Sequence, residues 1–245
     1  MTVASEHRQE ILENGFTIVR QVYSYPEIDS IISIISKADS SKETFRKSNN
    51  LFAIRQFLKE VPETIPFIFT GKLRTVIGQL FGSNFFAVKS IYFDKPGESN
   101  WFVSYHQDLT ISVKEKSSVA GFGPWSVKEN QYAVQPPLDI LENNFTIRIH
   151  LDDTTAGNGA LRVIPGSHLK GIYRPENIDP IAIGWTKERE AVCDVPKAAI
   201  MIMRPLLLHA SSRTTNNKKR RVIHIEFSSK KLPSPLEWSE LYVNN

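Results

Sequence analysis

A histidine and an aspartate stand two residues apart in the segment WFVSYHQDLTISV, residues 101–113. The aromatic and β-branched residues around them are typical of a strand, in which alternate side chains share a face. His106 and Asp108 are therefore expected on one face, with Tyr105 and Gln107 on the other. The pair alone is weak evidence for a binding site, because a surface strand with a His–Asp hydrogen bond would have the same sequence.

A third residue of the same chemistry, His209, ends an apolar run about one hundred positions later. Two imidazoles and one carboxylate form the facial triad that holds Fe(II) and leaves the opposite positions open for a co-substrate and O2. Two ligands would hold a labile divalent ion poorly, so this chemistry needs all three. We therefore interpret His106, Asp108 and His209 as candidate metal ligands and catalytic residues.

An arginine and a serine after His209 suit a carboxylate ligand. Arg220 follows His209 by eleven positions, on the next strand of an expected hairpin, and Ser211 shares the face of His209 if its strand continues. A planar guanidinium pairs with a carboxylate, and a hydroxyl adds a donor. Either Arg220 or the adjacent Arg221, together with Ser211, is thus expected to bind the distal carboxylate of 2-oxoglutarate. The alternative, a solvated basic turn, is favoured for Lys218 and Lys219.

The elements that must position these residues follow from the hydrophobic pattern. Apolar residues at helical spacing predict helices at 5–15, 24–41 and 70–84, with Ser5 as the N-cap of the first. A strand is predicted at 15–23. From residue 85 onward, short β-type runs alternate with clusters of Gly, Pro, Asn and Asp, which indicates a mainly β domain built as a double-sheet roll or a barrel. We expect one domain over 1–245, divided into a helical N-terminal flank 1–84, a jelly-roll core 85–230 and a C-terminal tail 231–245.

Composition narrows the class of protein. With 41% apolar and 23% charged residues, the 245-residue chain is of the ordinary globular type. A single cysteine excludes an internal disulfide framework and suits a reducing cytoplasm, and no apolar run approaches the length of a membrane span. Much of the net charge of +4 stands in the cluster NNKKRRV, which lacks interleaved aromatics. Nucleic acid and membrane are therefore not expected as partners, and the oligomeric state is left open.

Three motifs together resemble one known family. The stretches WFVSYHQDLTI, LDDTTAGNGALRVIPGSH and LHASSRTTNNKKRRVIHIEF, in this order, look like the phytanoyl-CoA dioxygenase family of Fe(II)- and 2-oxoglutarate-dependent oxygenases. The resemblance covers about residues 85–227. It implies a double-stranded β-helix, a cupin-like jelly roll flanked by helices. By motif, it implies that His106, Asp108 and His209 bind iron. It also implies that Arg220 with Ser211 binds 2-oxoglutarate, since spacing from the last histidine selects Arg220 over Arg221.

The strand NFTIRIHL departs from that pattern, because Arg148 stands where several relatives have a tryptophan. Alternation places Thr146, Arg148 and His150 on one face, opposite an apolar face. Since an unpaired buried arginine is too costly, the polar face meets either solvent or a polar cavity. We favour the cavity, in which Arg148 would contact 2-oxoglutarate or a substrate carboxylate and Thr146 and His150 would line the substrate site.

Three further residues are candidates for substrate contact. Trp125 and Gln135 lie in the long connection 114–144, which is expected to be irregular, and such connections are often lids. Lys89 is a candidate for the pocket wall, with a surface lysine as the alternative.

The resemblance implies an enzyme that couples decarboxylation of 2-oxoglutarate to hydroxylation of a small molecule, with release of succinate and CO2. Fe(II), 2-oxoglutarate and O2 would be its cofactor and co-substrates. The alternative is a non-catalytic or differently metallated binding protein of the same fold. The substrate and the position of oxidation stay undetermined, although Arg148 suggests an anionic substrate.

Overall fold

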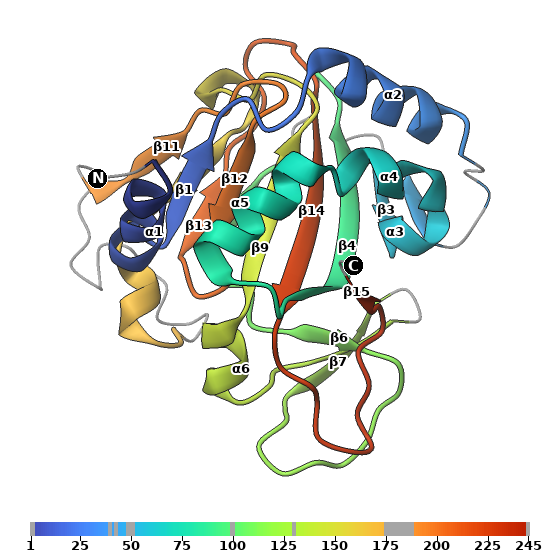
Figure 1. The fold of residues 1–245 in the computed structure, drawn as a ribbon, viewed down its shortest axis with the longest axis vertical. Helices are drawn as coiled ribbons and strands as arrows, with labels where there is room; N and C mark the ends of the chain where they lie inside the picture. The colour runs from blue at the N-terminus through green and yellow to red at the C-terminus, as the bar shows by residue number, and fades with distance from the viewer. Residues whose placement is uncertain are drawn as a thin grey trace.

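A computed structural model describes residues 3–38, 41, 44–47, 52–98, 101–128, 131–173 and 189–243. Antiparallel sheets form the body of the protein, and helices cover one face of the largest sheet (Figure 1).

The largest sheet has the strand order β1-β12-β9-β14-β4-β3-β2, with β15 beside β4, and all its pairs are antiparallel. Its strands are β1 (Phe16–Val19), β2 (Phe45–Lys47), β3 (Phe52–Arg55), β4 (Phe86–Lys95), β9 (Phe145–His150), β12 (Ile200–Met203), β14 (Arg220–Ser228) and β15 (Tyr242–Val243). The segment 1–84, expected as a helical flank, thus also supplies three strands to this sheet. Of these, β1 matches the strand predicted at 15–23, and β2 and β3 have no predicted counterpart.

Helices pack on the outer face of this sheet, and α5 crosses in front of β9 and β14 (Figure 1). These helices are α1 (Val3–Asn14), α2 (Tyr25–Ser36), α3 (Phe57–Glu60), α4 (Ile65–Ile68) and α5 (Gly71–Phe81). A further helix, α6 (Leu138–Asn143), contributes Ile140 to a separate apolar cluster. Ser24 and Glu27 cap α2 reciprocally, which satisfies two of its free amide groups. The first helix begins at Val3 and contains Ser5, so the N-cap prediction for Ser5 is wrong.

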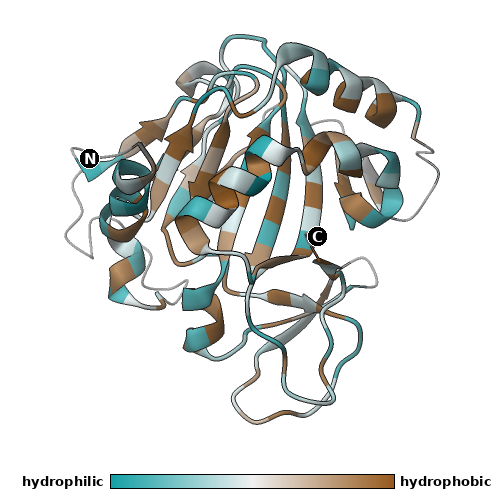
Figure 2. Ribbon diagram, in the orientation of Figure 1, coloured by the Kyte–Doolittle hydropathy of each residue, from teal (hydrophilic) through white to brown (hydrophobic). Residues whose placement is uncertain are grey.

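Strand alternation separates an apolar face from a polar one, as the sequence predicts. Phe145, Ile147 and Ile149 of β9 join the core under the helices. In Figure 2 the same alternation appears along β14, where hydrophilic and hydrophobic residues follow one another. Each fully buried side chain of this size contributes about 1.5–3 kcal/mol to folding, so the register of these strands is strongly fixed. The other face, with Arg148, is turned toward a second sheet.

The second sheet has the order β11-β10-β13-β5 and lies across from the first. Its strands are β5 (Val103–His106), β10 (Leu161–Val163), β11 (Ala191–Cys193) and β13 (His209–Ser211). Leu161 and Cys193 of this sheet pack with Met201 of β12, which closes one part of the space between the sheets. The two facing sheets form the double-stranded β-helix predicted from the sequence.

Two predictions about connections are wrong. His209 and Arg220 do not lie on a hairpin, because β13 pairs with β5 and β10 whereas β14 pairs with β4 and β9. The chain crosses from one sheet to the other between them, so the two residues face each other from opposite walls. The strand predicted at 101–113 is also divided, because β5 ends at His106 and β6 (Ile111–Val113) belongs to a third sheet.

The third sheet corrects the expectation of an irregular connection at 114–144. There β7 (Trp125–Lys128) and β8 (Gln131–Val134) form a hairpin against β6, below the main sheet in Figure 1. Alternation alone does not reveal these strands, because the run is interrupted by Gly and Pro and carries charges.

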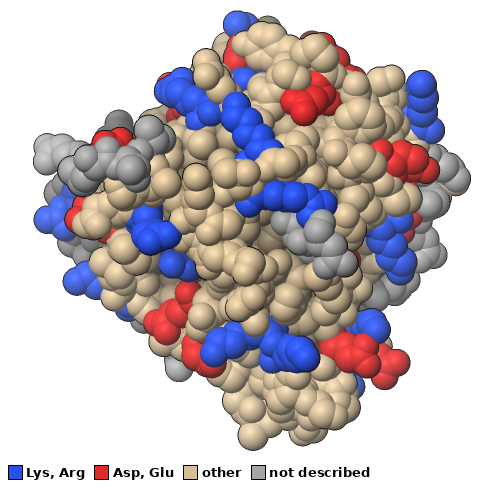
Figure 3. Space-filling model, viewed as in Figure 1, with Lys and Arg blue, Asp and Glu red and all other residues tan. Residues whose placement is uncertain are grey.

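Charges of both signs are spread over the face of the molecule that Figure 3 shows. Figure 3 shows Lys and Arg side chains together with Asp and Glu, separated by broad neutral areas. Within the basic cluster, Lys218 and Lys219 are exposed, as expected for a solvated turn, whereas Arg220 is buried. None of the helices in the described ranges is long and apolar enough to cross a membrane.

Candidate metal and co-substrate site

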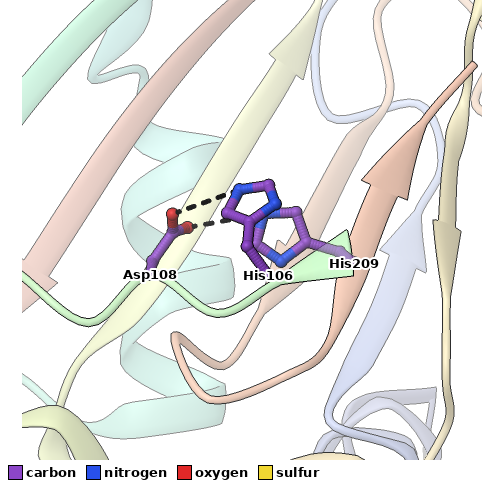
Figure 4. A group of neighbouring side chains, drawn as sticks. All are labelled: His106, Asp108 and His209. Carbon is purple, nitrogen blue, oxygen red and sulfur yellow. Dashed lines mark ion pairs between the residues drawn. The ribbon is translucent and has the colours of Figure 1, made fainter. Parts of the chain in front are cut away.

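The three candidate metal ligands converge at the rim of the second sheet (Figure 4). His106 ends β5 and pairs across the strands with His209, the first residue of β13. Asp108 Oδ1 lies 4.0 Å from His106 Nε2, and Asp108 Oδ2 lies 3.8 Å from His209 Nε2. These separations leave space for one ion between the three groups.

Backbone carbonyls orient both imidazoles. His106 Nδ1 lies 2.8 Å from the carbonyl of Ser104, and His209 Nδ1 lies 2.9 Å from the carbonyl of Leu207. A carbonyl can only accept, so Nδ1 carries the proton in each ring and Nε2 presents its lone pair toward Asp108. This is the outer contact that fixes a metal-binding histidine in the correct tautomer. The donor set therefore fits a divalent ion such as Fe(II).

The electrostatics keep His209 and Asp108 in their metal-binding protonation states. Burial lowers the pKa of His209 to about 4, so this imidazole is neutral at pH 7. Burial alone would raise the pKa of Asp108, but the nearby His209, His224 and Lys89 outweigh it and hold that pKa below its usual range. A neutral imidazole and an ionised carboxylate are the forms that ligate a metal.

Gln107 lies between His106 and Asp108, and its side chain bonds the segment that precedes His209. Its buried amide donates to the carbonyls of Gly171 at 2.8 Å and Leu206 at 2.7 Å, and accepts from the amide of Tyr173 at 2.8 Å. The amide of Asp108 also donates to the carbonyl of Pro205 at 2.9 Å. These contacts fix Asp108 relative to His209.

A cavity of about 570 Å³ opens between the two sheets beside the triad. The candidate residues that line it are His106, Asp108, His209, Lys89, Arg148, Ser211 and Arg220. The structure thus brings the iron and 2-oxoglutarate candidates together, and it places Arg148 and Lys89 on the same wall.

Two buried cationic side chains, Arg220 and Lys95, lie at one part of the cavity, and neither is paired with a carboxylate of the described residues. Arg220 NH1 donates to the carbonyl of Gly159, and its Nε has no hydrogen-bond partner among the described residues. Behind it, Lys95 Nζ donates to the carbonyl of Ser212 at 2.6 Å. Burial, and then repulsion from Arg148, lowers the pKa of Arg220 to about 9, while burial and Arg220 lower that of Lys95 to about 8. A carboxylate ligand would relieve this unpaired charge, which fits 2-oxoglutarate.

Arg221 has a different role in the fold. Its guanidinium makes two hydrogen bonds to Asp152, from Nε at 2.8 Å and from NH2 at 2.7 Å. The neighbouring arginines therefore separate by strand alternation, with Arg220 turned to the cavity and Arg221 paired on the other face.

Four substrate candidates lie outside the cavity lining. Trp125 packs beside the cluster that contains Val134, and Gln135 pairs through its backbone with the Gly123–Pro124 segment. Thr146 and His150 are buried on β9, where His150 Nδ1 bonds the hydroxyl of Thr154 at 2.7 Å. The lid role of Trp125 and Gln135 and the wall roles of Thr146 and His150 therefore stay predictions.

Sequence analysis missed two polar residues of the cavity wall, His224 and Glu226. Both are buried on β14. The signal was present, because residues 220, 224 and 226 share one face of a strand whose first residue was already placed at the site. Lys95 and Gln107 carried no comparable signal, because their contacts are with distant backbone groups.

Comparisons with known proteins agree with this geometry. Residues 11–222 match the sequence model of a family described as phytanoyl-CoA dioxygenase, whereas a search of curated proteins gives no match. Among solved structures, EctD from S. alaskensis with bound Fe is 16% identical, with a TM-score of 0.70 over 96% of this chain and 80% of its own. EvdO2 from Micromonospora carbonacea var. aurantiaca, complexed with 2-oxoglutarate, is 18% identical, with a TM-score of 0.66 over 98% of each chain.

A third similar structure has a different described activity. SnoK, a non-heme alpha-ketoglutarate-dependent carbocyclase from nogalamycin biosynthesis, is 16% identical, with a TM-score of 0.66 over 93% of this chain and 86% of its own. At such low identity these likenesses establish the fold and leave the reaction to the site.

Proposed function

The chain belongs to the phytanoyl-CoA dioxygenase family, and from this premise we propose that it is an Fe(II)- and 2-oxoglutarate-dependent oxygenase that hydroxylates a small molecule. Succinate and CO2 would be the co-products. The observation that carries the proposal is the convergence of two Nε2 atoms and one carboxylate beside a cavity that contains a buried, carboxylate-free arginine.

In this proposal His106, Asp108 and His209 hold the iron. Arg220 and Ser211 hold the distal carboxylate of 2-oxoglutarate. Fe(II), when bound, supplies the activation of O2 that is coupled to oxidation of the co-substrate.

The protein's own contribution is orientation and the exclusion of water. His209 and Arg220 project from facing sheets whose register is fixed by apolar cores, so the separation between the metal and carboxylate subsites is set by the fold. Both side chains are more than nine-tenths buried, which strengthens their electrostatic interactions with a bound anion.

Arg148 supports an anionic substrate or a second contact with 2-oxoglutarate. It is buried, lines the cavity, and its Nε has no partner in the described part of the chain. Burial lowers its pKa to about 10, which still leaves it charged at pH 7. With Arg220 assigned to 2-oxoglutarate, the charge of Arg148 remains available to a carboxylate.

The direct test is conversion of 2-oxoglutarate to succinate by the purified protein supplied with Fe(II) and then air. We expect slow, substrate-free turnover by the wild-type protein and its loss in Asp108→Ala. The matched control is Asp139→Ala, because Asp139 is an exposed carboxylate that is not among the residues lining the cavity. Metal binding without any turnover, even with candidate substrates, would favour a binding protein of the same fold.

A further inference from the structure

Four polar side chains form one hydrogen-bonded row on the wall of the cavity next to the triad. Lys89 Nζ lies 2.7 Å from Glu226 Oε1, which also lies 3.2 Å from His224 Nε2. His224 Nδ1 in turn lies 3.1 Å from Arg148 NH1. The row crosses three neighbouring strands, β4, β14 and β9, and all four residues line the cavity.

The direction of each hydrogen bond follows from what each group can donate. A guanidinium only donates, so His224 Nδ1 accepts from Arg148, and Nε2 therefore carries the proton that it donates to Glu226. Lys89 donates to the same carboxylate oxygen. Lys89 and His224 thus both donate to Oε1 of Glu226.

At the Lys89–Glu226 end of the row, one acceptor group and one donor group remain for a ligand. In the described ranges no donor reaches Glu226 Oε2, and Lys89 Nζ makes one hydrogen bond although it has three protons. The side chain of Glu226 is 7% exposed and that of Lys89 16%, and both lie on the cavity wall. This is a built polar subsite rather than a surface ion pair.

We propose that this Lys89–Glu226 subsite binds a hydroxyl group of the substrate, which donates to Glu226 Oε2 and accepts from Lys89 Nζ. The inference rests on the proposed oxygenase function and adds the class of substrate, an alcohol. A hydroxyl matches the pair because it is both donor and acceptor. A protonated amine has no lone pair for Lys89 and would lie beside another cation, and an ether cannot donate to Glu226.

The subsite also restricts where the alcohol is oxidised. One ligand atom of each of Asp108, His224 and Glu226 lies within 4.8 Å of the other two. A hydroxyl bonded to Glu226 would therefore lie near the carboxylate that would ligate iron. The carbon that bears this hydroxyl, or the carbon beside it, is the one presented for oxidation.

Three ring compounds of equal skeleton test the proposal. Cyclohexanol donates and accepts, cyclohexylamine in its protonated form only donates, and methoxycyclohexane only accepts. Their binding is measured by ligand-observed NMR to protein loaded with 2-oxoglutarate and Zn²⁺, which carries out no redox chemistry. We expect cyclohexanol to bind about tenfold more tightly than either analogue, the effect of roughly one net hydrogen bond.

Variants connect this preference to the two residues. Glu226→Leu should remove the preference, and the double variant Lys89→Met with Glu226→Leu should do the same without leaving a lone buried ammonium. Glu240→Gln is the matched control, because Glu240 is a buried carboxylate that bonds Ser90 and lies outside the cavity lining. It should keep the wild-type preference.

Equal binding of the three compounds, no binding of cyclohexanol to the wild-type protein, or a preference that survives in the double variant would each overturn the proposal. Substrate-free succinate formation is measured in parallel on the wild-type protein. Its absence would count against the oxygenase function, whereas an absent alcohol preference with succinate formation intact would count against the subsite alone.

Discussion

The contacts of Gln107 lead to a quantitative prediction about the metal site. Gln107→Met keeps the length of the side chain and removes three buried hydrogen bonds, two donated and one accepted. At roughly 0.5–1.5 kcal/mol net for each bond, the free energy of unfolding should fall by about 1.5–4.5 kcal/mol. This loss leaves a domain of ordinary stability folded.

The same change should weaken metal binding, although Gln107 is not a ligand in the proposal. It links the segment that holds His106 and Asp108 to the carbonyl of Leu206, three residues before His209. Loss of an outer contact of this kind typically weakens metal affinity by about 10–100-fold. Two of the three candidate ligands would then be free to move apart from the third.

Urea unfolding and calorimetric titration with Zn²⁺ measure the two effects separately. Gln131→Met serves as the control, because the side chain of Gln131 makes one long bond to Ser239, at 3.4 Å, on the third sheet. Its metal affinity should equal that of the wild-type protein. If Gln107→Met lowers the free energy of unfolding but leaves the metal affinity unchanged, the contacts do not position the ligands and this reasoning is refuted.

Three further predictions concern charge. Arg220→Gln should weaken 2-oxoglutarate binding at least about 100-fold, the loss of a buried bidentate ion pair, whereas Arg221→Gln should leave it unchanged in the same titration. In the metal-free protein, the unfolded chain binds more protons than the folded one between pH 6.5 and about 4, because burial lowers the pKa of His209. Stability should therefore fall by about 3 kcal/mol as pH drops through this window, and His209→Gln should flatten that slope in urea unfolding. Burial raises the pKa of Glu240 from 4.5 to about 7, so its contribution is lost as pH rises through this range. Glu240→Gln should consequently stabilise the protein at pH 8, by at most about 3 kcal/mol, and have little effect at pH 4.

The parts of the fold that sequence predicts well are those with a strong local pattern. Helix α5 buries Leu73, Ile77 and Leu80 at helical spacing, and β9 alternates apolar and polar residues over its whole length. In both, one face meets a continuous apolar core, so local pattern and tertiary packing agree.

The local sequence pattern does not predict which strands pair when they are distant along the chain. The runs that hold His209 and Arg220 read as a hairpin because they are close in sequence, yet each strand finds its partners in a different sheet. Gln107 could not be assigned a role for the same reason, since its partners lie 64 to 99 positions away. The candidate triad could be proposed in advance because its ligand types are rare and chemically restrictive.

Anaerobic binding of Fe(II) and 2-oxoglutarate, monitored by visible absorption, is the most direct test of the proposed metal and co-substrate site. A chelated co-substrate on Fe(II) gives an absorption band, and the wild-type protein should show it at one equivalent of metal. His209→Ala should abolish the band, and Arg220→Gln should shift it to much higher 2-oxoglutarate concentrations. A band of wild-type strength in His209→Ala, or no band with the wild-type protein, would contradict the assignment of the site.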